Sequence, residues 1–123
     1  MKTSELTGAA LDWAVATCEG FTEYDPATEK MLPPRKEYGW VPLCDYNWST
    51  DWSQGGPIIE REKIALMHIP DRLPHQQWAA GEMGETSAEF WEVVCGPTPL
   101  IAAMRCYVAS KLGDEVDVPE ELK

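Results

Sequence analysis

One segment near the C-terminal end has unusually clear helix boundaries and constrains the fold more than any other stretch. Thr98 is a favoured N-cap, Pro99 suits the first helical position because no amide partner is needed there, and Gly113 suits the left-handed residue after a helix. We therefore predict a helix over residues 99–112. Before its last turn the only charged residue is Arg105, so most sides of this helix should be covered by the core.

The composition indicates one acidic, folded domain over residues 1–123. A hydrophobic fraction of 44% with six tryptophans argues against disorder, while ten prolines and nine glycines predict many turns. The net charge of −11 comes without a basic patch, so we expect no direct nucleic-acid binding. The acidity serves either solubility or the attraction of a basic protein partner.

The cysteines and histidines give no signal for a metal site. The four cysteines form no C-x-x-C pair, and the two histidines lie far from them in sequence, so we expect no metal and no cofactor. The chain also opens without a signal peptide or an apolar run long enough to span a bilayer, which favours a reducing cytoplasm and no membrane. Neither His68 nor His75 has a recognisable catalytic partner in sequence.

The first half of the chain predicts a helix, a long irregular segment and a broken helix. Apolar residues recur at helical spacing over residues 8–19, and Thr7 is the expected cap. Residues 21–48 lose this periodicity and are rich in aromatic residues, so we predict an irregular excursion there. Residues 50–61 predict two short helical pieces interrupted by glycines, with Ser49 as the cap; a strand at Ile58 and Ile59 is the alternative.

Strand patterns follow at residues 64–69, 77–83 and 89–95, the last two separated by a turn at 84–87. Residues 2–5 could add an edge strand, and residues 114–123 form an acidic tail that Val116 and Val118 could tie down. The fold class is therefore α+β, a small mainly antiparallel sheet of about three to four strands covered by helices at about 8–19 and 99–112 and by the broken helix.

Two groups of residues are candidates for ligand binding. One is an aromatic and polar cluster, in which flat rings stand beside a hydroxyl and a carboxylate, as in a pocket for an aromatic ligand. The other is the start of the helix at residue 99, although ordinary capping is the favoured interpretation because Pro99 removes one of the amides that an anion would need. Whether the cluster is core or pocket stays open. The candidate residues are Tyr46, Trp48, Ser49, Asp51, Trp52, Trp78, Gly96 and Thr98.

Arg105 is a lone cation on the most apolar segment of the chain. A buried guanidinium usually needs a carboxylate partner, so we expect a structural ion pair between Arg105 and either Asp12 or Glu60. No residue carries a catalytic motif.

Three stretches resemble the NinX family of phage and prophage proteins from enteric bacteria. They are residues 2–14, residues 49–60 and residues 96–105, which together span under half of the chain. The order of elements is also similar, more faintly, to small phage α/β sandwich domains. The resemblance implies a phage origin, expression in the cytoplasm of the bacterial host and an accessory role, and it brings no catalytic residues.

The leading hypothesis is a non-enzymatic protein that binds a host or phage protein through an acidic, tryptophan-rich surface. The alternative is a small-molecule binder, for a nucleotide-like ligand, that uses a tryptophan-lined pocket near a helix N-terminus. An enzyme ranks third, and self-association stays open.

Overall fold

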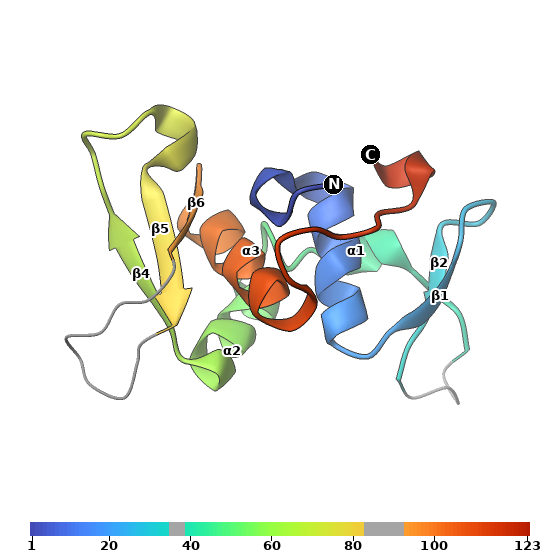
Figure 1. The fold of residues 1–123 in the computed structure, drawn as a ribbon. Helices are drawn as coiled ribbons and strands as arrows, with labels where there is room; N and C mark the ends of the chain where they lie inside the picture. The colour runs from blue at the N-terminus through green and yellow to red at the C-terminus, as the bar shows by residue number, and fades with distance from the viewer. Residues whose placement is uncertain (35–38, 83–92) are drawn as a thin grey trace.

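The helix predicted for residues 99–112 is the central element of the structure. In the computed structural model, which describes residues 1–34, 39–82 and 93–123, α3 runs from Pro99 to Leu112. It lies between one β-sheet and α1 (Gly8–Cys18), with α2 (Trp52–Glu62) packed beside it (Figure 1). The predicted cap is confirmed, because the Ile101 amide donates to the Thr98 hydroxyl at 3.1 Å.

Burial of α3 on almost every side explains its composition. Two of its alanines, Ala102 and Ala103, are fully buried, and these small side chains let the sheet and α1 approach closely. The end of the neighbouring strand comes so near that a Cβ on Gly96 would lie 2.9 Å from the Ala102 nitrogen. The helix therefore holds the two sides of the molecule together.

The sheet beside α3 consists of β4 (Ile64–His68), β5 (Trp78–Glu82) and β6 (Val94–Gly96), all antiparallel and in that order. Trp78 pairs with His68 on one side and with Gly96 on the other. The antiparallel pairing of the strands predicted at 77–83 and 89–95 is confirmed for the described part. The predicted turn at 84–87 and the residues up to 92 lie outside the described ranges.

A second antiparallel sheet lies on the far side of α1 (Figure 1), within the segment predicted to be irregular. It consists of β1 (Thr22–Asp25), β2 (Lys30–Leu32) and β3 (Val41–Pro42). The described residues thus form two three-stranded sheets instead of one, and the α+β class is confirmed. Strands of two to four residues are too short to produce the alternation by which a strand is found in a sequence.

The prediction of a broken helix at residues 50–61 is wrong, because α2 is continuous and Pro57 lies inside it. Its N-cap is Asp51, which accepts from the Ser53 amide at 2.9 Å, so Ser49 is not the cap and no strand forms at Ile58 and Ile59. Packing against α3 outweighs the poor helix propensity of two glycines and a proline.

The N-terminal segment and the acidic tail are joined to each other. The predicted edge strand at residues 2–5 is only an isolated bridge between Lys2 and Glu115, followed by a 3-10 turn. The Met1 amino group donates to the Val116 carbonyl at 3.0 Å. Because Val116 and Val118 are buried, the tail is tied down as predicted.

Gly55 offers a direct test of the contact between α2 and α3. A Cβ at this position would lie 2.5 Å from the Trp48 carbonyl oxygen and 2.6 Å from Leu100 Cδ1. Gly55→Ala should therefore lower the free energy of unfolding by about 1–3 kcal/mol in urea denaturation, because the helix must shift away. Gly56→Ala is the matched control: a Cβ there meets nothing within 4 Å, and the change should stabilise the helix by about 0.5–1 kcal/mol. Equal effects of the two substitutions would contradict the close packing.

Candidate functional site

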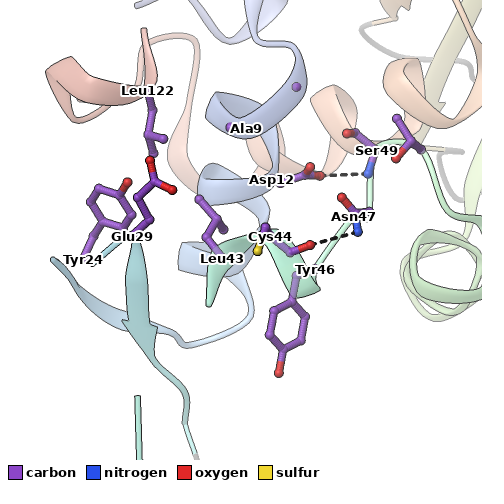
Figure 2. A pocket seen from close by; sticks show the side chains of 12 residues that line it. Ala9, Asp12, Tyr24, Glu29, Leu43, Cys44, Tyr46, Asn47, Ser49 and Leu122 are labelled. Atoms are coloured by element: carbon purple, nitrogen blue, oxygen red, sulfur yellow. Dashed lines mark hydrogen bonds between the residues drawn. The ribbon is translucent and has the colours of Figure 1, made fainter. Parts of the chain in front are cut away.

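A pocket of about 280 Å³ lies between the first turns of α1, the β1–β2 hairpin and the segment that leads into α2. We call it the Asp12–Tyr24 pocket. In Figure 2, Asp12 and Ser49 lie at one end, and Tyr24, Glu29 and Leu122 lie at the other. Its lining residues are Gly8, Ala9, Asp12, Tyr24, Glu29, Leu43, Cys44, Tyr46, Asn47, Ser49, Thr50 and Leu122.

A buried carboxyl group forms one end of the pocket. Asp12 is only 6% exposed, and one of its oxygens accepts a hydrogen bond from the Ser49 amide at 2.9 Å (Figure 2). Its other oxygen has no hydrogen-bond partner among the described residues. Burial raises the pKa of Asp12, while the Ser49 amide and hydroxyl act in the opposite direction. Asp12 thus provides a hydrogen-bond acceptor in the pocket, and burial of its charged form costs desolvation free energy.

Two hydroxyl groups that line the pocket are buried without a hydrogen-bond partner in the described structure: those of Ser49 and Tyr24. Ser49 is 1% exposed, and its hydroxyl lies close enough to Asp12 to affect the pKa without forming a hydrogen bond of good geometry. Leaving a buried polar group unpaired costs about 1–3 kcal/mol. Two such groups on separate elements therefore mark this cavity as a place where a polar ligand would gain contacts.

Local irregularities of the small sheet position Tyr24. The pairing of β1 with β2 shifts register between Thr22 and Tyr24, and the intervening Glu23 has a φ of 53°. Such bulges redirect neighbouring side chains. Glu29, at the other end of the hairpin turn, has a φ of 56° and raises the pKa of Tyr24, although burial of the Tyr24 hydroxyl raises it more. Both non-glycine residues adopt a conformation that costs energy, and both stand beside the pocket.

The N-terminus of α1 lines the same cavity. Thr7 is the N-cap residue, but its side chain makes no capping hydrogen bond, contrary to our prediction. The first amides of a helix have no partner within the helix, and Gly8 and Ala9 both line the pocket. These backbone N–H groups, with the positive end of the helix dipole, lie one turn from Asp12.

A second, shallower hollow of about 210 Å³ adjoins the first. It is lined by the exposed Trp52 and by Thr98, and it shares Ser49 and Thr50 with the Asp12–Tyr24 pocket. The Thr98 hydroxyl already accepts a hydrogen bond in capping α3, which leaves its own O–H for one further contact.

The candidate aromatic residues do not form one pocket. The rings of Tyr46 and Trp48 stack at 4.8 Å and both meet Phe21 edge-on, and the Tyr46 ring points away from Asp12 in Figure 2. Trp48 is 7% exposed, so this part of the cluster is core packing. Trp78 lies in the other sheet, 4.7 Å from the His68 ring.

The remaining candidates divide between the two hollows and the scaffold. Ser49 lines both hollows, and Trp52 and Thr98 line the shallow one. Asp51 serves as the α2 cap, and Gly96 permits close packing on α3. Of the residues that line the pocket, only Tyr46 and Ser49 were candidates from the sequence, and those that it missed include Tyr24, Glu29, Leu122 and the first turn of α1. The sequence signal for a hairpin there is the turn-forming Asp25-Pro26 pair, which lies between Tyr24 and Glu29.

Arg105 is buried but has different partners from those predicted. Its Nε donates to the Leu6 carbonyl at 2.8 Å, and a terminal nitrogen donates to the Cys95 carbonyl at 2.8 Å. The prediction of an ion pair between Arg105 and Asp12 or Glu60 is therefore wrong. A guanidinium carries five N–H donors, so main-chain carbonyls from two elements can satisfy it without a carboxylate.

Two further observations concern metal binding and membrane insertion. Across residues 1–34, 39–82 and 93–123, no group of three or more metal-binding side chains comes together. Within the same ranges no helix has both the length and the apolar character needed to cross a membrane.

Comparison with known proteins gives one result. The sequence model of a family described as "Bacteriophage P22, NinX" matches residues 2–111. The match includes all three stretches on which the resemblance was noted, as well as the residues between them. A comparison with curated proteins finds no match.

The raised pKa of Asp12 predicts how stability depends on pH. Because folding raises this pKa above 3.8, the folded state holds the proton more tightly, and its contribution to stability is lost as pH rises through the folded pKa. Asp12→Asn can keep the Ser49 amide bond but cannot ionise. The difference in unfolding free energy, variant minus wild type, should therefore increase from about pH 3 to about pH 7 in urea titrations. Glu60→Gln on α2 is the control, and a difference that falls with pH for Asp12→Asn would contradict the assignment.

Proposed function

The chain belongs to the NinX family of phage proteins, and on this premise we propose that it acts by binding a small molecule in the Asp12–Tyr24 pocket. The proposal includes a non-catalytic, accessory role in the cytoplasm of the bacterial host. It rests on one observation above all: two hydroxyl groups from separate elements are buried without partners on the wall of the same cavity.

The physical reason lies in the cost of those hydroxyl groups. A buried polar group is almost always paired in a native structure, so each unpaired one calls for an explanation. A ligand that bonds to both would recover the cost of their desolvation. The available acceptor oxygen of Asp12 and the N-terminus of α1, where Gly8 and Ala9 line the pocket, would add directional contacts. The pocket thus combines a largely apolar wall with a few convergent polar groups, as small-molecule sites do.

The two hydroxyl groups can be removed one at a time. Without ligand, Tyr24→Phe and Ser49→Ala should leave the unfolding free energy unchanged or raise it by up to about 1 kcal/mol, because an unpaired buried hydroxyl is lost. With a ligand found by thermal-shift screening of small polar molecules, the wild type should gain about 2.7 kcal/mol at a hundred times the dissociation constant. Each variant should lose much of that gain.

Thr3→Val is the matched control, since the Thr3 side chain is buried and its hydroxyl is paired, donating to the Gly113 carbonyl at 2.6 Å. This change should lower stability by about 1 kcal/mol and leave the ligand effect intact. The proposal fails if the pocket variants lose stability like the control, or if they bind the screened ligand as well as the wild type does.

Protein binding, the leading hypothesis from the sequence, becomes the second candidate here, and the exposure of Trp52 supports it. Trp52 is 53% exposed in the first turn of α2, beside the Asp51 carboxylate. Exposed tryptophans are typical anchors of protein interfaces. Trp40 is also exposed, at 45%, but Trp48 is buried, so the tryptophan-rich surface reduces to these two rings within the described residues whose burial is known.

A pull-down from host lysate tests this second candidate. If an acidic face anchored by Trp52 binds a basic protein, wild-type protein should retain it at low salt and release it as salt rises. Trp52→Ala should weaken retention by more than 2 kcal/mol, about 30-fold, as for an interface hot spot. Leu73→Ala, which truncates another exposed apolar side chain, is the control. Equal retention by all three proteins would rule out Trp52 as the anchor.

A further inference from the structure

We infer that the ligand of the Asp12–Tyr24 pocket is a neutral nitrogen heterocycle of the nucleobase or nucleoside class, without a phosphate or carboxylate group. This inference rests on the proposed function and specifies its ligand. It departs from the nucleotide-like ligand that the sequence suggested, because the charges around the pocket do not suit an anion.

The charge of the pocket excludes anionic ligands. Two of its lining residues, Asp12 and Glu29, carry carboxyl groups, and none of them is lysine, arginine or histidine. The whole chain has a net charge of −11, so the rest of the protein does not offset the negative potential at the pocket. A phosphate in this cavity would approach two carboxyl groups with no cation to neutralise it. The partial positive charge at one helix N-terminus is small by comparison.

The hydrogen-bonding groups suit a ligand with neighbouring donor and acceptor atoms. Ala9 and Asp12 are three residues apart in the first turns of α1, and both line the pocket. The first amides of α1 have no partner within the helix and can donate, whereas the second oxygen of Asp12 is an acceptor. A nucleobase edge, with an N–H beside a carbonyl or ring nitrogen, carries the complementary groups.

The two unpaired hydroxyls complete this arrangement. A hydroxyl both donates and accepts, so those of Ser49 and Tyr24 can bond to either kind of group on a heterocycle or a ribose. They lie toward opposite ends of the pocket in Figure 2, with Ser49 beside Asp12 and Tyr24 beside Glu29. A simple amine would satisfy the carboxyl groups but would leave the amides of α1 without an acceptor.

The size of the cavity also favours a compact ligand. Its volume of about 280 Å³ falls at the lower limit of the roughly 300–1,000 Å³ found for drug-sized ligands. A base or a nucleoside is therefore better matched to it than a nucleotide with its phosphates.

The test measures binding to the full chain by calorimetry and ligand-observed NMR. The probes are the common nucleobases and nucleosides, their 5′-monophosphates, a set of primary amines and a library of unrelated neutral fragments. At least one base or nucleoside should bind, and its 5′-monophosphate should bind at least tenfold more weakly. Asp12→Asn turns the free acceptor into a donor and should weaken binding about tenfold, roughly the effect of one hydrogen bond to a charged group. Glu60→Gln, with the same loss of charge on α2, should leave binding unchanged.

The outcomes separate this inference from the proposed function. If monophosphates bind as tightly as nucleosides, or if only amines bind, the inference is overturned. If only unrelated fragments bind and Tyr24→Phe abolishes that binding, the inference fails while the proposed function stands. If no probe of any class binds in the pocket, both fail.

Discussion

Burial of α3 on nearly all sides is the constraint on which the rest of the structure depends. One sheet covers one side of this helix, while α1 and α2 cover others, so every polar group it brings into the core must find a partner there. Arg105 meets this requirement through carbonyls of Leu6 and Cys95. Those bonds connect the N-terminal segment and strand β6 to one side chain of α3.

The position of α1 follows from that packing and in turn determines the pocket. Its inner side contacts α3, so the turn that carries Asp12 faces the segment leading into α2. The hydrogen bond between Asp12 and the Ser49 amide joins two parts of the chain 37 residues apart. The small sheet then closes the other end of the cavity. The pocket is thus made where three separately supported elements meet, and this is where small-molecule sites commonly form.

The sequence predicts features that depend on local signals and misses those that depend on assembly. The α3 boundaries, the Thr98 cap and the α+β class follow from capping chemistry and periodicity, which short segments carry themselves. The partners of Arg105 could not be found in this way, because main-chain carbonyls leave no mark in a sequence. Trp48 and Tyr46 were correctly grouped, but only the structure shows that their rings pack with Phe21. Tyr24 is positioned at the pocket by a β-bulge that no residue pattern in the sequence predicted.

The unusual features around the pocket all reduce the stability of the fold, so they call for an explanation other than packing. Glu23 and Glu29 have positive φ angles, the Thr7 side chain leaves α1 uncapped, and two hydroxyls are buried without partners. Phenylalanine or alanine at the hydroxyl positions would remove part of this cost, and glycine would relieve the strain. Proteins keep such unfavourable features mainly at sites where function needs them. In the described part of this chain both unpaired hydroxyls belong to one cavity, and two of the three non-glycine residues with positive φ lie in the hairpin beside it, the third being Lys63 at the end of α2. A common role at that cavity explains them together, whereas packing alone would have to explain each one separately.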